Sequence, residues 1–223
     1  MKKVLLFLIV LFLVGCSTPL QSSSDLVSTN FNSYALEAHL FLTIQNAENV
    51  SYFTFDYLEF VDIKRNSQKS FSNLSLNLSS TSEYDVQSSF TSIRIENQLF
   101  HSGVSGMQTL DYDAEPVYHV LELLITIFGN STILEIYESD SYIKYTVDSS
   151  LEYFSEYFRV LPYLYDLQEL TEKNIVFKIN KETKFIEEFT LSGSGPDSID
   201  NLYSFNHSVS LYDFNKNFSI EFP

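Results

Sequence analysis

The residue with the clearest chemical context is Cys16, the only cysteine in the 223-residue sequence. The chain starts with the basic pair Lys2-Lys3, continues with an uninterrupted apolar run from Val4 to Val14, and then reaches Gly15. A basic start, an apolar stretch and a small residue at the cleavage site, in this order, are typical of an export signal peptide. We therefore expect residues 1–15 to be removed, so that Cys16 becomes the first residue of the mature chain.

The alternative is an uncleaved N-terminal anchor helix. A membrane-spanning helix needs about 20 apolar residues, and this apolar run is shorter and is followed by a polar, serine-rich segment. Cleavage is the better interpretation.

The four residues Leu13-Val14-Gly15-Cys16 resemble the lipobox of bacterial lipoproteins. The resemblance implies that the Cys16 thiol receives a diacylglyceryl group through a thioether, and that the new amino group can also be acylated. Two acyl chains hold a protein durably on a membrane, whereas one chain gives only marginal attachment. We expect a mature protein that is lipid-anchored to the cell membrane on its extracytoplasmic face.

Metal chemistry has little support. Four histidines, at positions 39, 101, 119 and 207, show no metal-ligand spacing and are interpreted as structural. The acidic residues between Asp111 and Glu122 partly fit a calcium-binding loop, but Pro116 stands where that loop needs glycine. We expect neither a metal nor a cofactor.

Catalytic motifs are also missing from the sequence. The segment Gly103-Val104-Ser105-Gly106-Met107 departs from a nucleophile elbow because Met107 takes the place of the final glycine. The adjacent carboxylates Glu187 and Glu188 point to opposite faces of a strand, so they cannot act as an acid and base pair. We do not expect an enzyme.

Loss of residues 1–15 leaves 11 basic against 29 acidic side chains. Such an acidic protein repels nucleic acid and anionic lipid headgroups. The acidity indicates either a well-solvated surface or affinity for a cationic ligand. A lone cysteine excludes an internal disulfide, so the hydrophobic core must hold the fold together. The oligomeric state stays open.

Two regions follow the signal peptide. Residues 16–33 contain six serines and one proline, which is typical of a flexible tether. Residues 34–223 show no internal repeat and no second tether, and therefore predict a single domain.

Most of this domain predicts antiparallel strands. Leu36, Ala38, Leu40 and Leu42 alternate with more polar residues, as in a half-buried strand. A second strand carries Phe53, Phe55 and Tyr57 and is expected to change face before Leu58, Phe60 and Ile63 continue it. Further strands are expected around residues 74–78, 89–96, 99–101, 134–137, 142–145, 175–179, 185–191 and 203–211, and a last one through Phe218, Ile220 and Phe222. Asn97-Gln98 is expected to form the turn between the second and third of these. The glycine-rich residues 192–196 predict a mobile loop.

Two helices are predicted within the sheet sequence. The first is capped by Asp113 and carries apolar residues at helical spacing until Gly129-Asn130. The second begins at Ser149, with Glu152 completing a capping box, and reaches Pro162.

In its order of elements, the segment 36–223 resembles the LolA-like and LppX/LprG-like lipoprotein superfamily. The Phe177-Lys178-Ile179-Asn180 hairpin and the ending Asp213–Pro223 carry this resemblance at residue level. It implies an α+β fold, in which a curved antiparallel half-barrel has two or three helices packed on its concave face and can hold acyl chains between them.

A ligand in that position would contact apolar residues of the first helix and of the second strand. The residues expected to line the cavity are Phe53, Phe55, Val117, Leu121, Leu124 and Phe128. The resulting hypothesis is a lipoprotein that binds or carries a lipid or another lipophilic ligand. A non-enzymatic surface-interaction or structural lipoprotein with a filled core is the alternative.

Overall fold

A computed structural model of the chain describes residues 26–46, 50–78, 85–95, 98–103, 106–111, 120–154, 157, 171–196 and 201–221. The predicted signal peptide, residues 1–15, and the predicted lipidation site Cys16 lie outside these residues.

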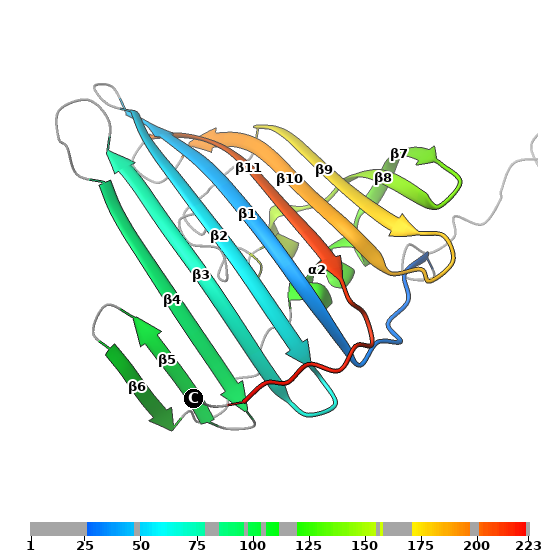
Figure 1. The fold of residues 1–223 in the computed structure, drawn as a ribbon. Helices are drawn as coiled ribbons and strands as arrows, with labels where there is room; N and C mark the ends of the chain where they lie inside the picture. Colours follow the sequence, from blue (N-terminus) through cyan, green and yellow to red (C-terminus); the bar gives the residue numbers. More distant parts are fainter. Residues whose placement is uncertain are drawn as a thin grey trace, which may run out of the picture.

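The described residues form one antiparallel sheet of eleven strands (Figure 1). In chain order the strands are β1 (Ser33–Gln45), β2 (Val50–Asp62), β3 (Ser67–Leu78), β4 (Asp85–Ile95), β5 (Gln98–Gly103), β6 (Gly106–Asp111), β7 (Thr132–Glu138), β8 (Tyr142–Asp148), β9 (Thr171–Asn180), β10 (Ile186–Pro196) and β11 (Leu202–Tyr212). Strands β1 to β6 are consecutive neighbours, and so are β7 to β11. Because β11 pairs with β1, the first and last strands meet inside the sheet, and β6 and β7 form its two edges.

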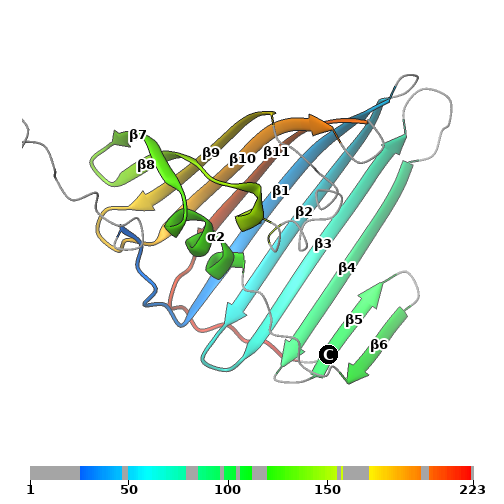
Figure 2. The same cartoon turned by 180° about the vertical axis from the view of Figure 1, so that it is seen from behind.

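The sheet is twisted and curved, and it is not closed into a barrel (Figures 1 and 2). The α-helix α2 (Val120–Gly129) lies against the concave face, which we call the inner face. This arrangement confirms the predicted half-barrel of α+β class. A 3₁₀ turn, Leu151–Phe154, follows β8, and Tyr157 after it is helical.

The two central strands show the alternation that the sequence predicts. In β11, Phe205, His207 and Val209 are buried, while Ser204 and Ser210 on the outer face are exposed. The paired strand β1 buries the predicted row Leu36, Ala38, Leu40 and Leu42 in the same way. One face of this sheet is therefore apolar, and burying it against α2 builds the core.

The described residues cover only part of each predicted helix. α2 ends at Gly129 as predicted, whereas residues 112–119, which include the expected cap, lie outside them. The second helix was expected from Ser149; the chain forms the 3₁₀ turn Leu151–Phe154 there, Tyr157 is helical, and residues 155–156 and 158–170 lie outside the description. Phe154 and Tyr157 are nearly fully buried, so their insertion into the core fixes this segment.

The prediction of a mobile loop at residues 192–196 is wrong. These residues extend β10 to Pro196, with Gly193 opposite Phe205 and Gly195 opposite Tyr203. Glycine weakens a strand by itself, but here bulky partners on β11 stand directly across from both glycines. Cross-strand pairing overrides the local preference.

The last predicted strand, through Phe218 and Ile220, is also absent from the described residues. After β11 the chain turns at Asp213 and Asn215, which have φ of 53° and 60°. The Asn215 amide donates to the Ser33 carbonyl at 2.9 Å, and the Asn32 amide donates to Asn215 Oδ1 at 2.7 Å. These bonds hold residues 213–221, the C-terminal segment, across the end of the sheet (Figure 1).

The domain begins earlier than residue 34. Val27 is buried in the core, Leu26 and Phe31 pack against it, and the Ser28 amide donates to the Lys184 carbonyl at 2.9 Å. Residues 26–32, which the sequence assigned to the tether, therefore belong to the folded part. The apolar side chains of this serine-rich stretch are the ones that pack.

Candidate functional site

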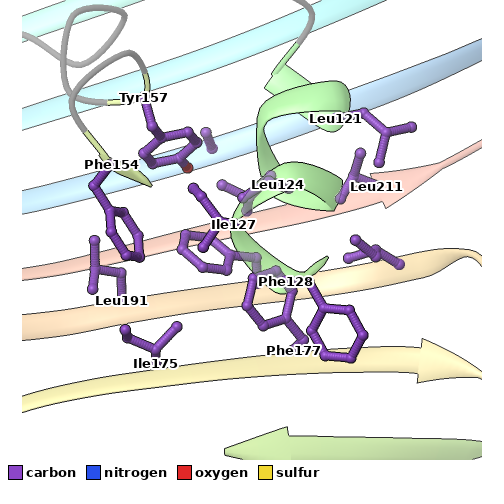
Figure 3. Close-up of a cluster of buried hydrophobic side chains, with 14 of the residues drawn as sticks. Leu121, Leu124, Ile127, Phe128, Phe154, Tyr157, Ile175, Phe177, Leu191 and Leu211 are labelled. Atoms are coloured by element: carbon purple, nitrogen blue, oxygen red, sulfur yellow. The ribbon is translucent and has the colours of Figure 1, made fainter. Parts of the chain in front are cut away.

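The inner face around α2 is the center of the hydrophobic core. Leu121, Leu124, Ile127 and Phe128 recur at helical spacing and are all buried. The Phe128 ring lies 5.0 Å from the ring of Phe177 on β9, in an edge-to-face arrangement (Figure 3). α2 is thus held to the sheet by its apolar stripe.

The C-terminal end of α2 is fixed by polar side chains. Asn130 Nδ2 donates to the Thr126 carbonyl at 2.8 Å, and Ser131 Oγ donates to the Ile127 carbonyl at 2.6 Å. The last carbonyls of a helix lack partners within the helix, so these two bonds satisfy groups that would otherwise be left open. They define where the helix stops and β7 begins.

The structure brings most of the predicted cavity residues together. Phe53, Leu121, Leu124 and Phe128 are each at most 1% exposed and belong to one cluster of buried side chains. Phe55 packs against this cluster and stays half-buried. Val117 lies outside the described residues. Four of the predicted lining residues are therefore enclosed by protein, and Phe55 is the one that keeps accessible surface.

Phe55 is part of an aromatic surface on β2. Its ring stacks on that of Tyr57, with centroids 6.0 Å apart and an interplanar angle of 18°. Both residues face inward, in the same row as buried Phe53, and both are half-buried. We call this pair the aromatic platform. It extends the apolar inner face beyond the packed cluster and leaves apolar surface available for contact.

The row of inward side chains on β2 continues from Tyr57 to Glu59, which is 1% exposed. Gln68 Nε2 of the neighbouring strand β3 donates to Glu59 Oε1. The second carboxyl oxygen, Oε2, has no hydrogen-bond partner among the described residues. Burial raises the pKa of Glu59 to about 7, although hydrogen bonds from Gln68 and Tyr57 lower it in part.

A second buried oxygen lies beside this carboxyl. Tyr34 is 0% exposed and lies on the inner face of β1, one diagonal position from Glu59 in the β1–β2 register. Its Oη lies near the Leu121 backbone but makes no hydrogen bond of ordinary geometry within the described part of the chain. Burial raises the pKa of Tyr34 well above its usual value, and the neighbouring Glu59 raises it further.

We call Tyr34, Tyr57, Glu59 and Gln68 the Glu59 cluster. The sequence interpretation missed it, because it assumed that β2 changes face after Tyr57. The alternation instead continues unbroken through Glu59 to buried Val61. A carboxylate in an inward position of a period-two pattern was the available signal, and the apolar residues Leu58 and Phe60 obscured it.

Buried His207 has a different role. Its Nδ1–H donates to the His39 carbonyl at 3.0 Å, which leaves Nε2 to accept from the Tyr157 hydroxyl at 2.6 Å. Both ring nitrogens are therefore satisfied, as the sequence interpretation expected. Burial lowers the pKa of His207 to about 4. A neutral imidazole locked in the core joins β11 to the segment that carries Tyr157.

His39 lies on the outer face between two carboxylates. Its Nδ1 is 2.7 Å from Asp56 Oδ1, and its Nε2 is 3.4 Å from Glu37 Oε1. In a pair of nucleophile and histidine base, one imidazole nitrogen contacts the nucleophile, whereas both nitrogens of His39 face carboxylates. The carboxylates approach opposite nitrogens, so they cannot share one metal ion with this imidazole. These are exposed polar contacts, which contribute little to stability.

The outer face also carries an open groove of about 660 Å³ at the β9–β10 turn. Lys178 lies in it and is neutralised by Glu188 at 2.6 Å, which raises the pKa of the lysine. The Phe185 and Phe214 rings stack 4.4 Å apart beside it. Lys178 of this groove is paired with both Glu187 and Glu188, and its side chain lies on the face opposite α2.

Among the residues that the structure describes, no group of three or more His, Cys, Asp or Glu side chains is placed to hold a metal ion. No helix in the described ranges is long and apolar enough to cross a membrane.

Neither a protein-family model nor a curated protein matches this chain. Among solved structures, it is similar to a DUF1329 family protein from Desulfovibrio piger ATCC 29098, with 8% identity, a TM-score of 0.30 and coverage of 92% of this chain and 96% of that chain. A beta-barrel-like protein of the domain of unknown function DUF1849 from Brucella abortus has 8% identity, a TM-score of 0.32 and coverage of 82% and 100%. A porin-like protein from Bacteroides uniformis ATCC 8492 has 8% identity, a TM-score of 0.27 and coverage of 83% and 97%. These similarities are too distant to assign a function to this chain.

Proposed function

We propose that the protein is a lipid-anchored, extracytoplasmic lipoprotein that holds a lipophilic ligand on its inner face, between the sheet and α2, and that it is not an enzyme. The observation that carries this proposal is the aromatic platform. Phe55 and Tyr57 offer accessible apolar surface that is continuous with the buried cluster under α2. Partly enclosed apolar surface with a few polar groups nearby is typical of a ligand site.

The anchor supports the same function. A diacylated Cys16 would keep the domain at the membrane surface, where lipids are the most abundant apolar ligands. The sequence before Cys16 has the basic, apolar and small-residue parts of a signal peptide in the correct order.

Anchoring is tested by metabolic labelling with an alkyne analogue of palmitate. We expect the wild-type chain to incorporate the label and the Cys16→Ser variant to lose it. Equal labelling of both chains would contradict lipidation at Cys16.

Ligand binding is tested on residues 16–223 carrying Cys16→Ser. All described contacts are made by residues 26–221, so this protein keeps them. We expect lipid in the organic extract of the purified protein, detected by mass spectrometry, and uptake of added lipid by the extracted protein. Empty protein that takes up no lipid would contradict the proposal.

A second candidate function is binding of a partner protein at the edge strand β7. Leu134, Ile136 and Tyr137 on this strand are 65%, 59% and 58% exposed. An exposed, apolar edge strand can add a strand from a partner. Crosslinking in intact cells at position 136 tests it, and a specific adduct that persists in a variant unable to bind lipid would favour this function.

A further inference from the structure

The Glu59 cluster combines two buried oxygens that lack partners. Glu59 Oε2 and Tyr34 Oη are both enclosed, and neither makes a hydrogen bond of ordinary geometry within the described residues. Leaving a buried polar group unpaired costs about 1–3 kcal/mol. Two such groups close together mark a place where a ligand could supply the missing hydrogen bonds.

The surroundings define what this partner can be. The neighbouring polar groups are uncharged, namely the Gln68 amide and the Tyr57 and Ser70 hydroxyls. An anionic group would be repelled by the Glu59 carboxyl, and no basic side chain contributes to its electrostatic surroundings. A hydroxyl group can donate to one oxygen and accept from the other, so it satisfies both Glu59 and Tyr34.

The aromatic platform lies next to this cluster on the same strand. Phe55, Tyr57 and Glu59 occupy successive inward positions of β2, so Phe55 and Glu59 are separated by about 13 Å along the strand. An amphiphile can therefore lay its apolar chain on Phe55 and Tyr57 while its polar end reaches Glu59.

We propose that the Glu59 cluster recognises the uncharged, hydroxyl-bearing head of an acyl lipid, such as an acylglycerol. This inference rests on the proposed function, because it assumes that a lipid occupies the inner face. It adds the class of headgroup and names Glu59 and Tyr34 as the residues that select it.

The test compares four ligands that share one acyl chain. They are 1-monooleoylglycerol, methyl oleate, oleate and oleylamine, and their binding to residues 16–223 with Cys16→Ser is measured by calorimetry at pH 7.5. We expect 1-monooleoylglycerol to bind at least about tenfold more tightly than methyl oleate, which lacks the hydroxyls, because a site built for a hydroxyl discriminates against its absence.

Variants then assign the preference to the cluster. Glu59→Gln keeps an acceptor oxygen at this position and should retain the preference, whereas Glu59→Leu, which has no acceptor, should reduce it to less than about threefold. Tyr34→Phe should weaken the binding of 1-monooleoylglycerol and leave the binding of methyl oleate unchanged. The matched control is Ser149→Ala, which removes another buried oxygen without a partner, away from the cluster. It should leave all four affinities unchanged.

The outcomes separate the two proposals. Equal binding of all four ligands, or a preference that survives in Glu59→Leu, overturns the headgroup assignment and leaves the lipid-binding function standing. Preference for oleylamine that is lost in Glu59→Gln overturns it in favour of a cationic head. Failure of the wild-type protein to bind any of the four overturns both.

Discussion

Two buried titratable residues, Glu59 and His207, have pKa values shifted in opposite directions. Both are enclosed by the inner face, and burial is the main cause in each case. They differ in their partners, since His207 has both nitrogens bonded and Glu59 has one open oxygen. This difference indicates a structural role for the histidine and is the basis of the ligand-binding role that we propose for the carboxyl.

The raised pKa of Glu59 makes stability fall as pH rises. Its contribution is fully present below the unfolded pKa of 4.5 and is lost by the folded pKa of about 7, a loss of about 3 kcal/mol. We expect Glu59→Gln to become more stable relative to wild type as pH increases from 4.5 to 7.5. Urea denaturation across this range measures the difference in the free energy of unfolding. If this free energy depends on pH in the same way in both proteins, the burial of an ionisable carboxyl is contradicted.

The lowered pKa of His207 acts in the opposite direction. Its contribution is fully present above pH 6.5 and is lost as pH falls through about 4, because the unfolded chain then binds the proton more readily. His207→Gln cannot take up this proton. The wild-type protein should therefore lose about 3 kcal/mol more than the variant between pH 6.5 and 4. An identical acid dependence of the two proteins would show that His207 is not enclosed.

The sequence predicted the burial of His207 but not that of Glu59. His207 lies in the regular pattern of β11, so its burial and its structural role follow from its position. The position of Glu59 could be predicted only by extending the alternation of β2 against the polarity of the residue. Its unpaired oxygen depends on β1 and β3, which no local pattern of β2 reveals.

At the scale of elements, α2 depends on its apolar stripe. Leu124 is 0% exposed, and replacing a buried leucine by alanine costs about 2–5 kcal/mol. We expect Leu124→Ala to lower the free energy of unfolding by this amount, whereas Thr126→Ala on the exposed side of the same helix should change it by less than about 1 kcal/mol. Thermal or urea denaturation distinguishes them. Equal effects would mean that α2 does not pack on the sheet as described.

The turn at Asn215 holds the C-terminal segment on the sheet. Asn215→Ala removes the acceptor for the Asn32 amide and places alanine at a φ of 60°, so it should cost about 1–3 kcal/mol. Asn215→Gly also removes the acceptor but adopts this φ without strain, and it should cost less. The free energies of unfolding are measured by denaturation. A glycine variant that is less stable than the alanine variant would contradict the described turn.

Elements were predictable where the pattern was local and regular. The strands that became β1 and β11, and the hairpin of β7 and β8, follow from the sequence. The failures have tertiary causes: Phe205 and Tyr203 stand opposite glycines that otherwise favour a loop. The turn at Asp213 and Asn215 diverts a segment whose alternation predicts a strand.

For the whole molecule, the class of fold was predictable and the strand order was not. Apolar alternation and a short helix predict a sheet with one covered face. The pairing of β1 with β11 joins residues far apart in the chain, as in Leu36 with Leu211, and no hairpin specifies it. This pairing places the aromatic platform and the Glu59 cluster on the inner face, near α2.

The central claim is that an acyl chain lies on this inner face. Photolabelling with a monoacylglycerol that carries a diazirine in its acyl chain, followed by peptide mapping, tests it most directly. We predict adducts on β2 at Phe55 or Tyr57 and on α2, with none on the exposed outer-face pair Phe41 and Tyr52. Labelling of Phe41 and Tyr52 with an unlabelled platform would contradict the account.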